Sequence, residues 1–320
     1  MPRPSARSLA RLLLVSALGL LAGGCQGPGA DRRPSEPAAS GADRRPLVVT
    51  TFTVLADMAR SVAGERLRVH SITREGAEIH GYEPSPADIE AAAGADLIVA
   101  NGLGLERWAR RFVAAAGNGP TVTLTEGMAP LPIAGEDAGG KPNPHAWMSP
   151  RRAQHYVDRL VEAFSRLDPA GAPIYAARGA AYRARLGELD AELRQALEQV
   201  PPARRLLVSC EGAFTYLAHD YGLQEAYLWP VNGERQITPR RMAQLIDTVK
   251  RRRVPAVFCE STVSDRPQRQ VARASGARFG GTFYVDSLSG PAGPAPTLLK
   301  LQRHNVKLIV EGLAAAGGRP

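Results

Sequence analysis

The chain has 320 residues, of which 44% are hydrophobic and 22% are charged, and its formal net charge is +9. This composition is typical of a folded globular protein and excludes a disordered chain or a polytopic membrane protein. Three cysteines are too few for a scaffold held together by many disulfides. Residues 1–45 carry a net charge of +4, which leaves +5 for the other 275 residues. The basic charge is therefore partly N-terminal, and we expect no nucleic-acid partner.

The first 25 residues have the pattern of a signal peptide. Three arginines precede an apolar run, Leu12–Ala22, which is shorter than the roughly 20 residues that span a bilayer. The run ends at Cys25 after small residues, which resembles a lipobox. We therefore expect residues 1–25 to be a signal peptide with Cys25 as the site of lipid attachment. The alternative is ordinary cleavage nearby and a free Cys25.

Residues 26–46 are rich in Gly, Pro, Ala and Ser and contain almost nothing apolar to bury. Such a segment cannot form a packed core. We predict that it is a disordered tether between the membrane anchor and the folded part of the chain.

Apolar runs and amphipathic segments alternate from Leu47 onward, which predicts an α/β lobe with a mainly parallel sheet over residues 47–170. A helix is expected to begin at Ser149-Pro150, with Ser as the N-cap. The predicted strands are Leu47–Thr51, Leu67–Ile72, Leu97–Ala100 and Val122–Leu124. The predicted helices are Val54–Val62, Ala87–Ala93 and Glu106–Ala115.

Leucines recur at helical spacing within residues 171–200, which predicts one long helix over Pro173–Val200, about 40 Å in length. The alternation then restarts over residues 201–320. The strands predicted there are Leu206–Ser209, Ala256–Cys259 and Thr282–Val285, and the helices are Ala213–Tyr221, Pro239–Arg252, Pro267–Ala274 and Thr297–Leu313. The predicted architecture is two similar α/β lobes, with mainly parallel four-stranded sheets, joined by one rigid helix.

Four residues are candidates for metal binding. His80 and His145 lie in proline-rich loops, while Glu211 and Asp286 follow predicted strands of the second lobe. Ligands of open α/β sheets bind beyond the carboxyl ends of the strands, so these side chains are expected to meet in one cleft. Two neutral imidazoles and two carboxylates would balance the charge of one divalent cation. Taken singly, each residue also fits a surface role, a helix N-terminus or a turn.

Catalytic signatures do not appear in the sequence. It has no Walker A, G-x-S-x-G, H-E-x-x-H or C-x-x-C motif. We therefore expect that the chain cannot itself hydrolyse ATP through a P-loop.

From Leu47 to Leu313 the chain resembles the solute-binding lipoproteins of manganese/iron ABC transporters, of the Yfe/Sit type that binds chelated iron and manganese in the periplasm. The resemblance rests on the segment around His80 and on Thr51–Met58, Pro142–Met148, Val208–Phe214, Phe258–Asp265 and Gly280–Ser289. It implies two α/β lobes on a helical backbone. It also implies that His80, His145, Glu211 and Asp286 bind the metal. The expectation that the chain is a binding protein and not an enzyme follows from the same resemblance.

The resemblance further implies Mn²⁺ or Fe²⁺ as the bound cargo, with Zn²⁺ binding in vitro because its affinity ranks higher. Zinc-specific members carry a third histidine where Glu211 stands, and residues 115–144 lack a His-rich loop. The implied partners are a cognate ABC permease and a separate ATPase subunit. We expect a monomer outside the cytoplasm, in the periplasm or on the outer face of the cell membrane, lipid-anchored.

Cys210 and Cys259 each precede a glutamate at the end of a predicted strand. An exported protein meets an oxidising environment, so the pair is a candidate disulfide, and two buried free thiols are the alternative. Glu260 and Trp147 are candidates for supporting the metal ligands from behind, although Glu260 is also an alternative carboxylate ligand and Trp147 also fits a core role.

Two other functions are alternatives to the receptor. A secreted metal-dependent hydrolase would use the same four residues but would need an open coordination position and a nearby base. A zinc-specific relative, or one that binds haem or a siderophore, would share the two-lobed plan. A haem or siderophore carrier would need a wide apolar cleft in place of four converging ligands.

Overall fold

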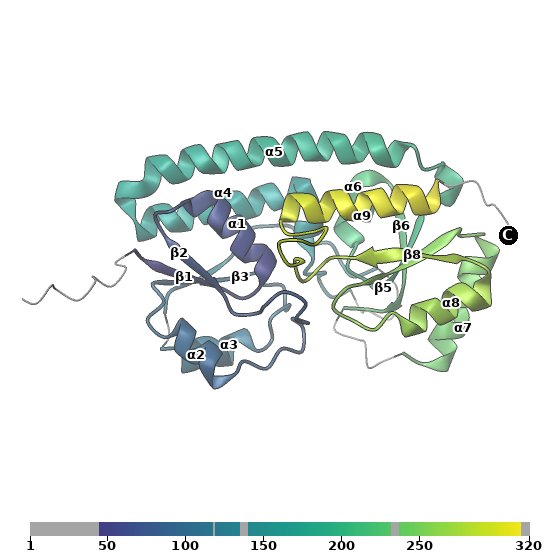
Figure 1. Cartoon of the computed structure of the whole chain (residues 1–320), viewed down its shortest axis with the longest axis horizontal. Coiled ribbons are helices and arrows are strands. Elements are labelled where there is room, and N and C mark those ends of the chain that lie inside the picture. The colour runs from purple at the N-terminus through teal and green to yellow at the C-terminus, as the bar shows by residue number, and fades with distance from the viewer. Residues whose placement is uncertain (1–44, 118, 135–139, 232–236, 315–320) are drawn as a thin grey trace, which may run out of the picture. The chain divides into compact units, whose positions relative to one another are not determined.

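The structure is a computed structural model that describes residues 45–117, 119–134, 140–231 and 237–314 (Figure 1). The predicted signal peptide, the lipid-attachment residue Cys25 and nearly all of the predicted tether lie outside the described residues. Within the described ranges, no helix combines the length and the hydropathy needed to cross a bilayer.

The N-terminal lobe is built on a parallel four-stranded sheet in the order β2-β1-β3-β4. The central strands β1 and β3 are almost wholly apolar and buried, as expected for parallel strands covered on both faces. The strands are β1 (Leu47–Thr50), β2 (Arg68–Ser71), β3 (Leu97–Ala100) and β4 (Thr121–Thr123). The helices are α1 (Thr53–Ala63), α2 (Pro86–Ala92), α3 (Ala109–Ala115) and α4 (Pro150–Leu167).

Helix α4 begins where the Ser149-Pro150 pair predicted it to begin. Ser149 is the N-cap residue by position, but its side chain does not cap the helix. Its hydroxyl donates instead to Asp220 in the C-terminal lobe at 2.7 Å. The side chain at the N-cap position of α4 therefore forms a hydrogen bond between the two lobes.

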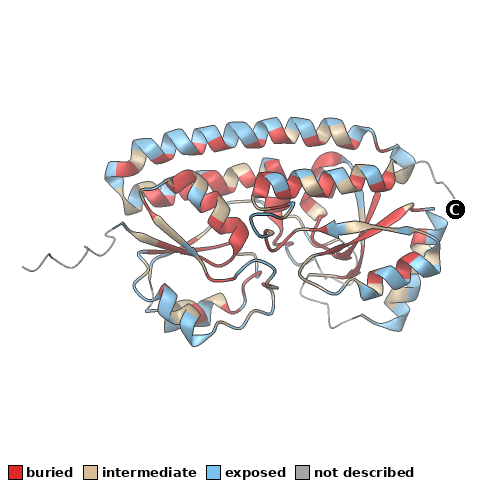
Figure 2. Ribbon diagram, viewed as in Figure 1, coloured by how far each residue is buried: buried red, intermediate tan, exposed pale blue. Residues whose placement is uncertain are grey.

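The predicted connecting helix is α5 (Ala172–Glu198), a single helix of 27 residues. It packs against α4 and α1 on one side of the molecule and against α9 of the C-terminal lobe on the other. One stripe of the helix is buried, while its other face is mostly exposed (Figure 2). The stripe consists of Tyr175, Gly179 and Tyr182 followed by the predicted leucines Leu186, Leu189, Leu193 and Leu197. The helix thus runs along both lobes and contributes to the core of each (Figure 1).

The C-terminal lobe contains four strands, paired as two parallel ladders, β5–β6 and β7–β8. The strands are β5 (Leu206–Glu211), β6 (Gln224–Trp229), β7 (Ala256–Glu260) and β8 (Arg278–Phe283). The helices are α6 (Thr215–Tyr221), α7 (Pro239–Arg251), α8 (Arg266–Ser275) and α9 (Leu298–Leu313).

Three details of this lobe differ from the prediction. Strand β6 was not predicted: it begins with the polar pair Gln224-Glu225, and its apolar residues are confined to Ala226–Trp229. Strand β8 begins four residues earlier than predicted, because Gly280 and Gly281 within it have low strand propensity. The expected four-stranded sheet is two ladders, and the amide of Glu211 donates to a side chain on β7, that of Glu260, at 3.3 Å.

The α/β fold class with parallel sheets, two lobes and one long connecting helix is confirmed. The domain boundaries at residues 170 and 200 stay a prediction.

Candidate metal site

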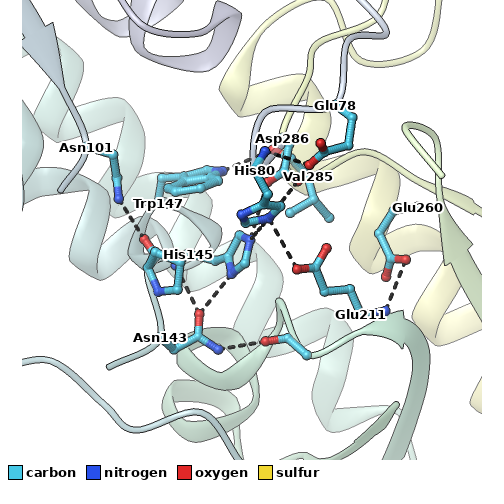
Figure 3. Close-up of polar contacts among 12 residues, drawn as sticks. Glu78, His80, Asn101, Asn143, His145, Trp147, Glu211, Glu260, Val285 and Asp286 are labelled. Carbon is cyan, nitrogen blue, oxygen red and sulfur yellow. Dashed lines mark hydrogen bonds and ion pairs between the residues drawn. The ribbon is translucent and has the colours of Figure 1, made fainter. Parts of the chain in front are cut away.

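The four candidate ligands lie together where loops of the two lobes meet (Figure 3). His80 lies in the loop between β2 and α2, and His145 directly precedes the short helix η2 (Ala146–Met148). Glu211 is the last residue of β5, and Asp286 follows β8 by three residues. One potential ligand atom from each residue lies within 4.8 Å of the others. Their side chains are at most 6% exposed.

Both imidazoles direct the same ring nitrogen, Nε2, toward the two carboxylates. The Nε2 atom of His80 is 3.2 Å from Glu211 Oε1 and 3.3 Å from Asp286 Oδ2. The Nε2 atom of His145 is 3.4 Å from Asp286 Oδ1, and the two Nε2 atoms are 3.3 Å apart. Two nitrogens and two carboxylates therefore converge on one point, which is an arrangement that can hold a cation.

The side chain of Asn143 determines which nitrogen of His145 carries the proton. Its Oδ1 accepts a hydrogen bond from the His145 amide at 3.0 Å and lies 2.9 Å from His145 Nδ1. Because that oxygen can only accept, Nδ1 must be protonated and Nε2 presents its lone pair to the site. Asn143 lies within the Pro142–Met148 motif, and its place two residues before His145 was the available sequence signal for this role.

The His80 loop is held by the carboxylate of Glu78, a residue without a predicted role. Glu78 accepts the amide of His80 at 2.6 Å and that of Gly81 at 2.7 Å. The indole of Trp108 donates to the carbonyl of Ile79 at 3.0 Å. The backbone on both sides of His80 is therefore fixed before any ligand binds.

The charges of the site shift the ionisation of its members. Burial alone would lower the pKa of His80, but the carboxylates of Glu211 and Asp286 raise it well above its ordinary value. Burial would raise the pKa of Asp286, but the charge of the neighbouring His80 lowers it overall. Burial, and then the charge of Glu211, raise the pKa of Glu260 well above the ordinary range. Without metal, the site thus favours a protonated His80 and a neutral Glu260.

The predicted supporting residues lie directly beside the ligands. Trp147 is fully buried, its ring centroid is 5.2 Å from that of His145, and its Nε1 donates to the carbonyl of Val285 at 3.1 Å. That contact connects the His145 segment to the residue before Asp286 (Figure 3). Glu260 is buried on β7 and accepts the amide of Glu211.

Cys210 and Cys259 are joined in a disulfide. Each cysteine directly precedes a buried glutamate, so the bond connects the ends of β5 and β7 immediately behind Glu211 and Glu260. The disulfide therefore fixes the strand end that carries one of the four converging side chains.

Comparison with known proteins gives the site its context. The family model described as "Zinc-uptake complex component A periplasmic" matches residues 48–312. The chain belongs to this family of metal-binding proteins of ABC transporters. Members of this family are substrate-binding transport proteins, which work with a permease and an ATPase.

Individual relatives match this chain over most of their length, and a solved structure of this kind has a similar fold. The iron-binding protein YfeA of Yersinia pestis is 45% identical over 88% of this chain and 89% of its own length. The manganese-binding lipoprotein MntA of Halalkalibacterium halodurans is 32% identical over 94% of this chain and 97% of its own. A Mn-bound periplasmic metal-binding protein from Candidatus Liberibacter asiaticus superposes with a TM-score of 0.77 at 35% identity, covering 84% of this chain and 99% of its own.

Proposed function

We propose that this protein is an extracytoplasmic receptor that captures Mn²⁺ or Fe²⁺ between its lobes and delivers the ion to an ABC permease for import. The observation that carries the proposal is the convergence of His80, His145, Glu211 and Asp286, which are proposed as the metal ligands. The names of the iron- and manganese-binding relatives support the choice of cargo.

Charge balance supports a divalent cation. Two neutral imidazoles and two carboxylates carry a charge of −2, so one divalent ion makes the buried site neutral. An uncompensated charge in such a buried position would be costly. Carboxylate-rich sites suit Mn²⁺ and Fe²⁺, while Zn²⁺ would also bind because the affinity order of divalent metals favours it. Affinity in vitro therefore does not identify the physiological cargo.

The same geometry argues against the alternative of a metal-dependent hydrolase. A catalytic metal keeps a coordination position open for water or substrate. Four side chains converge here, and two of them are carboxylates that can each offer a second oxygen. We therefore propose that the bound ion is cargo and that the protein catalyses no reaction.

The oligomeric state, the lipid anchor and the cognate permease are part of the same proposal. We propose a monomer that is anchored by lipid on Cys25 and that meets its cognate permease, with the separate ATPase subunit, at the membrane. Two acyl chains are enough for stable anchoring. The Cys25→Ser variant should move from the membrane fraction to the soluble extracytoplasmic fraction, and unchanged membrane association would contradict the anchor.

Metal binding by single variants tests the ligand set. Asp286→Ala and His145→Ala should each abolish high-affinity Mn²⁺ binding in calorimetry while the circular dichroism spectrum is unchanged. His304→Ala is the matched control, because in the described part of the chain this half-buried histidine lies away from the four ligands, contacting the carbonyl of Thr282 and the ring of Tyr284. Retained affinity in the first two variants would contradict the proposed ligands. Elemental analysis of the protein from its native host, with metals neither added nor removed, identifies the cargo.

A further inference from the structure

The amide group of Asn143 reaches from the His145 segment into the C-terminal lobe. Its Oδ1 accepts hydrogen bonds from His145. Its Nδ2 donates to the carbonyl of Gly212 at 2.6 Å and to the hydroxyl oxygen of Thr215 at 2.9 Å. The backbone carbonyl of Asn143 accepts the hydroxyl of Tyr216 at 2.8 Å. Asn143 is completely buried, so these contacts have no water to replace them.

The orientation of the Thr215 hydroxyl depends on Glu225. Thr215 donates to Glu225 Oε2 at 2.8 Å, which leaves its lone pair free for the amide of Asn143. Glu225 Oε1 accepts the amide of Phe214 at 2.8 Å. Two donors therefore converge on Glu225, and an ionised carboxylate suits them because it only accepts hydrogen bonds.

The four side chains form a directed chain of hydrogen bonds that crosses the lobe boundary. It runs from Nδ1 of His145 through Asn143 and Thr215 to Glu225 on β6. The first two residues belong to the N-terminal lobe and the last two to the C-terminal lobe. When Glu225 is ionised, each hydrogen bond has one allowed direction, so the chain specifies the Nδ1-protonated form of His145.

We propose that Thr215 and Glu225 are positioning residues for His145, which hold its Nε2 lone pair toward the metal only while the lobes are in contact. The inference rests on the proposed function and extends it to residues that do not touch the ion. It follows that a movement separating Gly212 and Thr215 from Asn143 weakens metal binding. The Asn143 amide would then no longer be held in the orientation that keeps the proton of His145 on Nδ1. Hydrogen-bond partners behind a metal ligand commonly change metal affinity about 10–100-fold.

The test compares Thr215→Val and Glu225→Gln with the conservative variant Thr215→Ser, which keeps the hydroxyl. Thr248→Val is the matched control, because the Thr248 hydroxyl contacts only its own helix α7 and a neighbouring arginine in the described structure. Measurements are made on the full-length protein at pH 8, above the pKa of about 7 to which burial raises the Glu225 carboxyl. Circular dichroism checks folding, and Glu225→Gln serves if Thr215→Val does not fold.

Two readouts decide the proposal. Mn²⁺ affinity by calorimetry should fall about tenfold in Thr215→Val and in Glu225→Gln, and no further in the double variant, because both act through one chain. It should stay within about twofold of wild type in Thr215→Ser and Thr248→Val, well short of that tenfold fall. Nitrogen-15 NMR of the metal-free protein should show the Nδ1-protonated form of His145 in wild type and a mixture of tautomers in the two variants.

Unchanged affinity, or lowered affinity with an unchanged tautomer, would overturn the proposal. A wild-type protein that binds neither Mn²⁺ nor Fe²⁺ would contradict the proposed function instead. The tautomer is read without metal and so decides the role of Thr215 and Glu225 independently.

Discussion

The hydroxyl oxygen of Ser287 accepts a hydrogen bond from the backbone amide of Gly76 at 2.7 Å. Ser287 directly follows Asp286, and Gly76 lies four residues before His80, so this contact connects two loops that carry proposed metal ligands. Ser287 is 1% exposed and also donates to the carbonyl of Leu288. Thr53 adds a second contact between the lobes, because its hydroxyl oxygen accepts the amide of Leu288 at 3.0 Å.

We predict that Ser287→Ala weakens metal binding by loosening the Asp286 loop. Losing one buried hydrogen bond costs about 1 kcal/mol, which corresponds to a roughly fivefold lower Mn²⁺ affinity. The change should appear mainly as faster dissociation, measured by stopped-flow mixing with a chelator. Ser275→Ala is the control, because among the residues that the structure describes the Ser275 hydroxyl contacts only helix α8 and its end. Equal dissociation rates in both variants would contradict the prediction.

Metal binding should release a proton from His80. Burial lowers the pKa of this imidazole, but the charges of Glu211 and Asp286 raise it well above 6.5, so His80 is protonated at pH 7 when no metal is bound. A metal needs the neutral imidazole, so binding displaces about one proton and affinity increases with pH until that pKa is reached. Calorimetry at pH 7 in buffers with different ionisation enthalpies measures this number. A heat of binding that is independent of the buffer would show that no proton is released.

The disulfide should stabilise the folded chain. Cys210 and Cys259 are 49 residues apart, and closing a loop of that length restricts the unfolded chain by about 4 kcal/mol in the chain-entropy model. The double variant Cys210→Ala/Cys259→Ala should lose about 2–4 kcal/mol in urea-induced unfolding. Wild-type protein measured with a reductant should show a similar loss. A variant that is as stable as the oxidised wild type would contradict the stabilising role.

Asp168 should make stability depend on acid pH. Its carboxylate accepts two hydrogen bonds from Arg66, at 2.8 and 3.1 Å, and one from the hydroxyl of Tyr175, at 2.6 Å. The hydrogen bonds from Arg66 and Tyr175 lower the pKa of Asp168 from 3.8 to about 2. Because the folded-state pKa is depressed, the stabilisation is fully present above pH 3.8 and is lost as the pH falls through about 2.

Asp168→Asn should therefore lower the melting temperature at pH 7, and the difference from wild type should shrink as the pH approaches 2. Thermal unfolding followed by circular dichroism at several pH values checks this. Asp158→Asn is the control, because Asp158 pairs with Arg183 at an exposed position where ion pairs contribute little. A difference that stays constant down to pH 2 would show that Asp168 acts through packing and not through its charge.

Most of the secondary structure could be predicted from local sequence. The leucine stripe of α5 and the apolar runs of β1 and β3 are periodic patterns that depend only on neighbours along the chain. Strand β6 and the start of β8 could not be predicted in this way, because Gln224, Glu225 and Gly281 carry no strand signal and adopt strand geometry through pairing with β5 and β7.

In the candidate site, too, some features could be predicted from local sequence and others depend on tertiary contacts. The sequence by itself determined the candidate ligands. His80, His145, Glu211 and Asp286 are residue types that bind metals, and each lies in a proline-rich loop or after a predicted strand. The sequence also led us to expect that their side chains meet in one cleft. Only the tertiary structure decided their distances, and that Asn143, Thr215 and Glu225 form the chain of hydrogen bonds behind His145. The contact that crosses between the lobes joins Asn143 to Thr215, which lie 72 positions apart. The direction of these hydrogen bonds depends on donor and acceptor atoms that come within reach only after the two lobes have packed together.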